Sequence, residues 1–356
     1  MSSPMDAPND LVLDRAKGAV CGGAAGDALG AGYEFTNPYP EDEIIMKGGG
    51  AFNWAPGEWT DDTAMAVAIL DVLAKGCCDL EEIGNNFLSW YASSPPDVGI
   101  QTSAVLSSAQ NGAELILAGQ EFYDKYPNKA GNGALMRTGP VALSALGDRE
   151  LVASNAEAIA ALTHAHPDST TACVLWSLAI EEAIMAPETD EAFDWAGAIK
   201  NGLSFLDGGL VNRWQELIDE AVQGPSILFN PNGYVISAFQ AALSAIIETP
   251  VPVDKPSDHF MKALETAIRI GDDCDTVAAI AGSLLGARWG VNAIPKEWKE
   301  VIHGARTVGN EIVNFAELES LAKETPLSVN PDLDNNIGIS ICTVFITISD
   351  VNLPVV

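Results

Sequence analysis

Apolar residues recur along most of this chain at the three- and four-residue spacing of amphipathic helices. In residues 80–93, for example, Ile83, Phe87 and Tyr91 fall on one helical face. Segments of this kind, bounded by turn residues, predict helices over residues 11–29, 64–75, 80–93, 102–117, 151–162, 170–185, 190–206, 213–222, 235–248, 258–270, 277–287, 295–303 and 313–323, with a break at Gly208 and Gly209. The pattern therefore predicts an all-α protein.

The character of the chain changes at Pro326. Residues 337–348 are rich in β-branched side chains and alternate as a β-strand does. We therefore divide the chain into a loose tail at residues 1–10, one helical domain at residues 11–325 and a short C-terminal extension of β character at residues 326–356.

Two predicted helices begin in clusters of acidic residues. TDDT (residues 60–63) precedes the helix at 64–75, and GDDCDT (residues 271–276) precedes the helix at 277–287. Helix capping explains either cluster alone, since a Thr N-cap and acids in the first turn stabilise a helix start. The second helix, however, has Ser283 as its only polar residue, so it is expected to be buried on all sides. Carboxylates at two buried helix starts favour a bound cation, and oxygen ligands suit Mg²⁺, Mn²⁺ or Ca²⁺ better than zinc.

Other stretches contain residues that could act in binding or catalysis, and each of these residues also has an ordinary structural explanation. Glu34 lies between two aromatic residues, which is unusual for a surface loop, and Asp97 follows two prolines in a turn, where it can also cap the next helix. NKAGNGALMR (residues 128–137) is a glycine-rich turn expected to lead into a helix and to offer backbone N–H groups to a phosphate, while Arg137 faces an anion or a carboxylate. THAHPD (residues 163–168) ends a helix, where histidines usually cap or pack.

The Gly/Ala-rich segment at residues 18–27 invites comparison with a dinucleotide-binding loop. The Gly-x-Gly-x-x-Gly register is absent, and no strand precedes the segment. Close packing between helices is the better interpretation, because small residues let two backbones approach.

The amino-acid composition limits the classes of binding partner and the cellular location that we expect. The chain has 49 acidic and 18 basic residues and a net charge of −31, which repels nucleic acid and anionic membranes, so neither is expected as a partner. The six cysteines show neither zinc spacing nor a disulfide framework, which indicates reduced thiols. The start of the chain does not resemble a signal peptide, and no run of about twenty apolar residues exists. We expect a cytoplasmic monomer.

Taken in order, these stretches resemble the ADP-ribosylglycohydrolase family, which includes ADP-ribosyl-arginine hydrolases, ADP-ribosyl-serine hydrolases and dinitrogenase-reductase-activating glycohydrolases. The resemblance covers about residues 11–325. It rests on five motifs in the family order, none specific alone: GDALG (residues 26–30) with Glu34, WTDDT (59–63), GNGALMR (131–137), Thr163-His164, and GDDCDT (271–276) with its Ala/Gly helix.

The resemblance implies a compact orthogonal bundle of helices with two divalent cations, Mg²⁺ or Mn²⁺, at its centre. The implied metal ligands are Thr60, Asp61, Asp62, Asp273, Asp275 and Thr276. The implied substrate-binding residues are Gly131, Asn132 and Gly133 beside the diphosphate and His164 near the ADP-ribose. Glu34 matches a glutamate that lies over the metals, and Asp97 matches an acid of the arginine-cleaving relatives. Lys129 and Arg137 are expected to add positive charge for the diphosphate.

The implied activity is metal-dependent hydrolysis of the glycosidic bond between ADP-ribose and a modified target, releasing ADP-ribose. The implied catalytic residues are Glu34, Asp61, Asp62 and Asp97. Two cations about 3.5–4 Å apart can hold ribose hydroxyls and polarise a water, while a nearby acid accepts its proton. Asp97 favours the arginine of an ADP-ribosylated protein as the target, although serine, a nucleic-acid end and an ADP-ribosylated small molecule stay open.

Two other functions fit the same residues. One is a non-catalytic ADP-ribose-binding or structural protein on the same scaffold. The other is a two-metal nucleotide phosphohydrolase, which would release AMP or phosphate in place of ADP-ribose.

Overall fold

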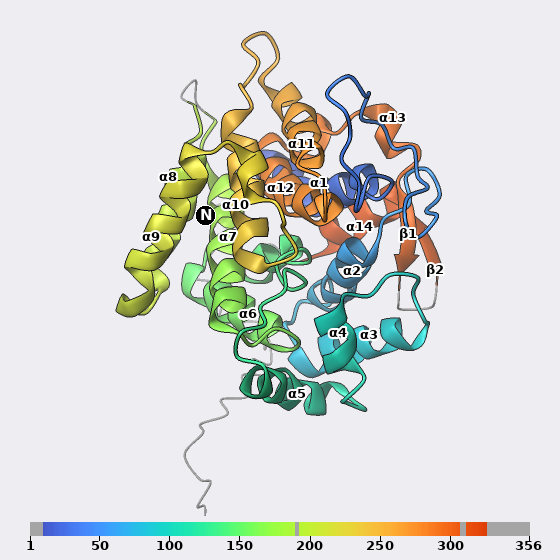
Figure 1. Ribbon diagram of the computed structural model, residues 1–356, viewed down its shortest axis with the longest axis vertical. Helices are drawn as coiled ribbons and strands as arrows, with labels where there is room; N and C mark the ends of the chain where they lie inside the picture. The colour runs from blue at the N-terminus through green and yellow to red at the C-terminus, as the bar shows by residue number, and fades with distance from the viewer. Residues whose placement is uncertain (1–9, 189–191, 307–310, 326–356) are drawn as a thin grey trace, which may run out of the picture.

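A computed structural model describes residues 10–188, 192–306 and 311–325 and is built almost entirely of helices (Figure 1). Its elements, in chain order, are α1 (Asp10–Gly30), α2 (Asp61–Leu73), α3 (Leu80–Ala92), α4 (Ile100–Leu106), α5 (Gly112–Lys125), η1 (Gly139–Ala145), α6 (Arg149–Ala161), α7 (Pro167–Met185), α8 (Trp195–Asn201), η2 (Gly202–Phe205), α9 (Gly208–Gln223), η3 (Ser226–Phe229), α10 (Val235–Glu248), η4 (Pro256–Asp258), α11 (His259–Arg269), α12 (Cys274–Trp289), η5 (Val291–Ala293), α13 (Lys296–Lys299), β1 (His303–Arg306), β2 (Glu311–Asn314) and α14 (Phe315–Glu324). The predicted all-α class is confirmed. Among the described helices, none combines the length and the apolar character needed to cross a membrane.

The centre of the molecule is the antiparallel pair α1 and α12 (Figure 1). Their backbones approach so closely that a Cβ atom on Gly286 would come within 1.9 Å of the carbonyl oxygen of Gly18, and one on Gly22 within 2.3 Å of that of Gly282. Only glycine permits this approach, which explains the Gly/Ala density of both helices. The pairing also brings the end of α1 to the start of α12, since a Cβ on Gly30 would lie 2.3 Å from the Cα of Asp275.

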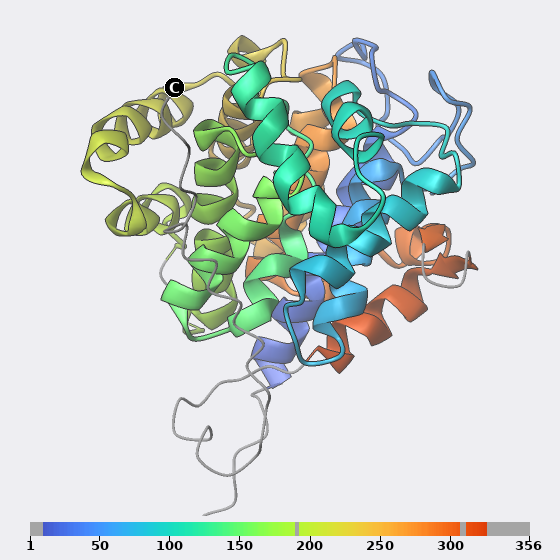
Figure 2. The same cartoon turned by 90° about the horizontal axis from the view of Figure 1, so that it is seen from below.

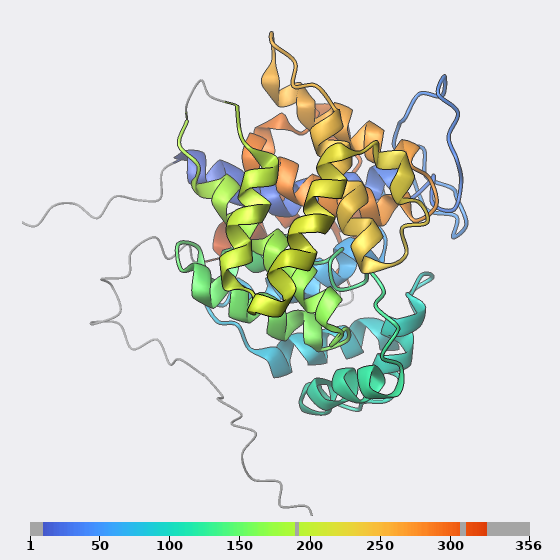
Figure 3. The same ribbon diagram turned by 60° about the vertical axis from the view of Figure 1, so that its left-hand side comes forward.

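The other helices cover this pair. Helices α3 to α5 close one side of the bundle (Figure 2), and α8 and α9 form an outer layer over α7 and α10 (Figure 3). As a result, every residue of α12 from Cys274 to Ala287 is buried, as its sequence predicts.

A short β-hairpin near the end of the described chain supports α2. The backbone N–H of Trp59 donates to the carbonyl of His303 at 3.0 Å, and the Trp59 indole packs against Gly304, where a Cβ would lie 2.2 Å from the indole nitrogen. In addition, Arg306 donates to both carboxylate oxygens of the buried Asp71 on α2. The hairpin therefore holds the segment that leads into the acidic start of α2.

Several predicted elements are wrong in detail. The helix expected over residues 102–117 is two helices, because Asn111 caps α5 by accepting from the backbone N–H of Glu114. The expected break at Gly208 and Gly209 is instead the start of α9.

Near the C-terminal end, the helices expected over 295–303 and 313–323 are present as α13 and α14 but differ at their ends, because residues 303–306 and 311–314 pair as strands. The predicted strand at 337–348 lies outside the described residues, and the division into tail, domain and extension stays a prediction, with α1 beginning at Asp10.

Candidate active site

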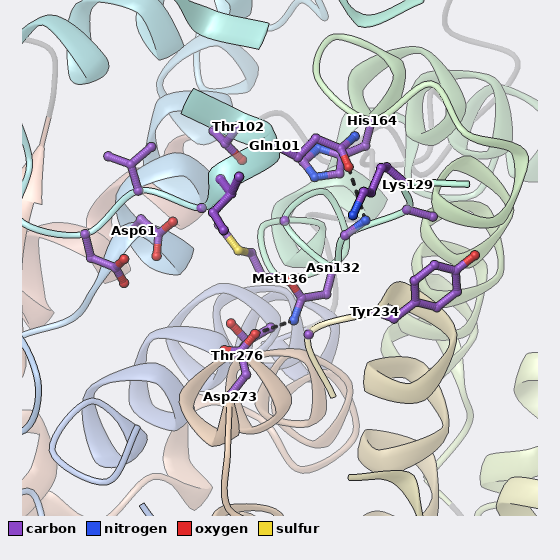
Figure 4. Close-up of a pocket in the computed structure, with 18 of the residues that line it drawn as sticks. Asp61, Gln101, Thr102, Lys129, Asn132, Met136, His164, Tyr234, Asp273 and Thr276 are labelled. Carbon is purple, nitrogen blue, oxygen red and sulfur yellow. Dashed lines mark hydrogen bonds between the residues drawn. The ribbon is translucent and has the colours of Figure 1, made fainter. Parts of the chain in front are cut away.

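A cavity of about 910 Å³ opens above the starts of α2 and α12 (Figure 4). Nearly all of the site residues predicted from the sequence line it: Glu34, Asp61, Asp97, Lys129, Gly131, Asn132, Gly133, His164, Asp273, Asp275 and Thr276. Three do not line it: Thr60 and Asp62, which are buried, and Arg137, described below. The fold thus gathers residues as far apart in the chain as Glu34 and Thr276 around one cavity.

Asp62 links the two acidic helix starts directly. Thr60, the N-cap of α2, donates its hydroxyl to Asp62 Oδ2 at 3.0 Å, and Thr276 in the first turn of α12 donates to the same oxygen at 3.3 Å. Asp62 and Asp275 also have carboxylate oxygens within 4.8 Å of each other. The prediction that the two acidic clusters meet at the centre of the domain is therefore confirmed.

Asp27 is a site residue that the sequence analysis passed over. Its carboxylate, fully buried near the end of α1, accepts hydrogen bonds from the backbone N–H groups of Thr60 (3.0 Å) and Thr63 (3.0 Å) and from the Thr63 hydroxyl (2.6 Å). Asp27 thus caps α2 from a different helix and sets the orientation of the first turn that carries Asp61 and Asp62. A lone acid inside a Gly/Ala helix was the sequence signal for it.

The carboxylates form two overlapping groups suited to cations. In each group the side-chain oxygens lie within 4.8 Å of one another, one group being Asp27, Asp62 and Asp275 and the other Glu34, Asp273 and Asp275. Among the described residues, three buried carboxylate oxygens of these groups have no hydrogen-bond partner: Glu34 Oε2, Asp62 Oδ1 and Asp275 Oδ1. Buried carboxylate oxygens are normally paired, so these residues fit hard divalent cations well.

We predict that Asp27→Asn weakens cation binding by roughly 10- to 100-fold, as expected when a group that orients metal ligands is changed. Asparagine keeps one acceptor oxygen and replaces the other with an NH2 donor, so it cannot reproduce all the hydrogen bonds that the Asp27 carboxylate accepts from Thr60 and Thr63, and the alignment of the first turn of α2 is weakened. Calorimetric titration with Mn²⁺ measures the affinity. An unchanged affinity would limit Asp27 to a role in folding.

The pKa values of the acids in the site are raised, because the carboxyl groups are buried close to one another. Burial, and next the charge of Asp97, raise the pKa of Glu34 to about 9. Burial followed by the charge of Asp273 raises the pKa of Asp97 to about 6, although a hydrogen bond with Asp61 opposes the rise. Burial likewise holds the pKa of Asp61 and of Asp275 well above the usual range. Such a site binds positive charge strongly, because a cation removes the repulsion between the ionised acids.

The glycine-rich loop forms the opposite wall of the cavity. Gly131 donates its backbone N–H to Gln101 Oε1 at 3.2 Å, and Asn132 donates its side-chain amide to Asp273 Oδ2 at 2.7 Å (Figure 4). Gly133 lies against the His164 ring, since a Cβ there would come within 3.0 Å of the ring carbon Cε1. The loop is thereby attached to the acidic floor, and a side chain at Gly133 would push into His164. The loop leads to the 3-10 helix η1 and not into the α-helix that the sequence suggested.

Arg137 does not reach the cavity, contrary to the sequence-based expectation. It is fully buried, donates to the Thr163 hydroxyl at 2.7 Å and stacks 4.3 Å from the Phe87 ring centroid. Burial, and then the charge of Arg137, lower the pKa of His164 well below its usual value. His164 therefore presents a neutral imidazole to the cavity, and among the predicted residues that line it Lys129 is the one cationic side chain.

Other lining residues were not predicted. Gln101, which also donates to the carbonyl oxygen of Thr163, holds the glycine-rich loop. Tyr234 also lines the cavity, and its hydroxyl donates to Asp168 Oδ2 at 3.1 Å, a carboxylate that Arg213 also binds. These contacts join segments far apart in the chain, so no local pattern marks them.

Comparison with known proteins gives a consistent result. The sequence profile of the ADP-ribosylglycohydrolase family matches residues 8–330. An ADP-ribosylarginine hydrolase of Pseudomonas putida is 32% identical over 301 residues, which is 82% of this chain and 75% of that protein. The ADP-ribosyl-[dinitrogen reductase] glycohydrolase of Rhodospirillum rubrum is 32% identical over 297 residues, or 81% of this chain and 90% of that protein.

A solved structure is also similar. A chain described as an ADP-ribosylglycohydrolase-related protein complex superposes with a TM-score of 0.69 and 28% sequence identity, covering 89% of this chain and 98% of that one. The fold expected from the sequence motifs is confirmed.

Proposed function

The chain belongs to the ADP-ribosylglycohydrolase family, and from this premise we propose that it is a divalent-cation-dependent enzyme that releases ADP-ribose from ADP-ribosylated arginine of a protein. The family establishes the coarser statement, hydrolysis of a glycosidic bond to ADP-ribose. The cation dependence, the arginine linkage and the roles of individual residues are the proposal.

The observation that carries the cation dependence is the pair of overlapping carboxylate groups that share Asp275. Asp62, Asp273 and Asp275 supply the oxygens, and Thr60, Asp61 and Thr276 complete the proposed ligand set. When bound there, two Mg²⁺ or Mn²⁺ ions supply Lewis acidity and a fixed positive charge beside the ribose.

Two walls of the cavity are assigned to different parts of the substrate. Gly131, Asn132 and Gly133 lie on one wall with Lys129, so we assign this wall to the diphosphate, which backbone amides and one ammonium group can hold. The neutral His164 imidazole lies beside the loop in the cavity lining and suits the uncharged ribose. The reacting carbon is thereby positioned over the acidic floor.

The opposite wall suits a cationic leaving group. Glu34 lies close enough to Asp97 for the charge of Asp97 to raise its pKa, and Asp97 hydrogen-bonds with Asp61. A guanidinium in this position would lie beside acids whose ionised forms are otherwise disfavoured. Its positive charge would stabilise those ionised forms. We assign Glu34 the role of proton acceptor for the attacking water. Burial and the nearby acids raise its pKa to about 9, so it needs the positive charge of bound cations to stay ionised for this role.

The proposal is tested with a panel of defined substrates that carry ADP-ribose on arginine, on serine and on a nucleic-acid end. We expect Mg²⁺- or Mn²⁺-dependent release of ADP-ribose from arginine at a rate at least about tenfold above the other two. Mass spectrometry identifies the product. Release of AMP would indicate a phosphohydrolase, and a faster reaction on serine would contradict the arginine assignment.

A further inference from the structure

The mouth of the cavity carries apolar side chains on the same side as the acidic wall. Phe35 is 58% exposed beside Glu34, and its ring centroid lies 6.5 Å from that of Phe52. The second acid of this wall, Asp97, is followed in the chain by Val98 and by Ile100, which is 93% exposed at the start of α4. Phe35, Phe52, Val98 and Ile100 all line the cavity, and we call them the apolar rim. Exposed apolar groups beside an active site indicate a binding surface more often than exposed apolar groups scattered singly.

Phe35 is held in this place against its backbone preference. Its φ angle is 58°, in the left-handed region that a bulky side chain rarely adopts. Its N–H donates to the carbonyl oxygen of Asp272 at 2.7 Å, and Asp272 itself has a φ angle of 57°. A glycine or asparagine would suit position 35 better, so the exposed aromatic ring has a reason other than folding.

The acidic wall, which the rim adjoins along the chain, and the anion-binding wall lie on different sides of the cavity. In Figure 4, Asp61 is on the left and Lys129 and Tyr234 are on the right. Phe35 directly follows Glu34 and Val98 directly follows Asp97, so the rim adjoins the acidic wall along the chain, whereas the ADP-ribose is assigned to the wall with Lys129. What lies at the rim is therefore the carrier of the ADP-ribose and not the nucleotide.

We infer that the apolar rim docks the polypeptide segment that carries the modified arginine, and that it prefers apolar or basic side chains next to that arginine. This inference rests on the proposed function. Apolar contacts with the rim flank the arginine, while the acidic wall and the net charge of −31 favour a basic partner. The enzyme then acts on protein-borne ADP-ribosylarginine in preference to the free modified amino acid, which makes no contact with the rim.

The test compares two substrates, free ADP-ribosylarginine and a peptide in which ADP-ribosylarginine is flanked by leucine and lysine. Wild-type enzyme is expected to hydrolyse the peptide with a kcat/KM at least about tenfold higher. Ile100→Ser and Phe35→Asn should each reduce that ratio by a factor of about five or more, mainly through KM for the peptide. Phe35→Asn should melt at or above the wild-type temperature, because asparagine tolerates the left-handed backbone.

Val253→Ser is the matched control, since Val253 is 95% exposed and does not line the cavity. It should keep the wild-type ratio. A wild type without preference for the peptide, or rim variants that keep the full preference, would overturn the docking role. A wild type that releases ADP-ribose from neither substrate but does so from serine overturns the arginine proposal, and the docking inference falls with it.

Discussion

Asp275→Asn is expected to lower turnover by a factor on the order of 10³ or more, because the metal centre supplies several kcal/mol of transition-state stabilisation. Asp275 is the residue common to both carboxylate groups, so its replacement disturbs both cation sites together. One of its oxygens is buried without a hydrogen-bond partner among the described residues, which leaves it free to bind a cation. The protein should still fold, since removing one of several crowded acids relieves repulsion.

The same centre predicts the response to chelation. EDTA should abolish activity, and Mg²⁺ or Mn²⁺ should restore it and raise the free energy of unfolding by about 2.7 kcal/mol at a hundredfold excess over the dissociation constant. Asp275→Asn should show a much smaller thermal shift with Mn²⁺ than wild type.

Asp71→Asn provides the control, because this buried acid lies on α2 but pairs with Arg306, outside the carboxylate groups. It should lose stability and keep its Mn²⁺ affinity. Full wild-type activity in metal-free buffer, or a wild-type rate for Asp275→Asn, would refute the proposed centre.

Glu34→Ala should separate binding from chemistry. Glu34 belongs to one carboxylate group, so the group formed by Asp27, Asp62 and Asp275 stays intact and at least one cation should still bind. ADP-ribose affinity should remain within roughly tenfold, about 1.4 kcal/mol. The kcat should nevertheless fall by a factor on the order of 10² or more, as when a positioned proton acceptor is lost.

Asp62→Ala is expected to behave differently from Glu34→Ala. Asp62 accepts hydrogen bonds from Thr60 and Thr276 and so joins the two helix starts. Its loss should lower cation occupancy and ADP-ribose affinity together. Calorimetry with ADP-ribose and single-turnover kinetics distinguish the two patterns. If Glu34→Ala retains its full rate, the base must be one of Asp61, Asp62 and Asp97.

Much of the site was predictable because its residues occur in short motifs. The acids at 60–63 and 271–276 and the turn at 131–137 each stand out locally, and the structure brings all three to one cavity. Arg137 was misjudged for the same reason: its motif suggested an anion site, whereas its side chain turns inward to Thr163 and Phe87. A motif indicates which residues are present, but side-chain direction depends on packing.

The helical class and the buried character of α12 were predictable from local patterns, because apolar periodicity and Gly/Ala density are properties of short stretches of the chain. The tertiary structure decided the role of Asp27, whose carboxylate meets Thr60, 33 residues further along the chain, because α1 packs against the start of α2. It also decided the strand pairing of β1, which depends on contacts with Gly57 and Trp59. Long-range contacts of this kind leave no periodic trace in either partner segment, so they appear only once the chain is folded.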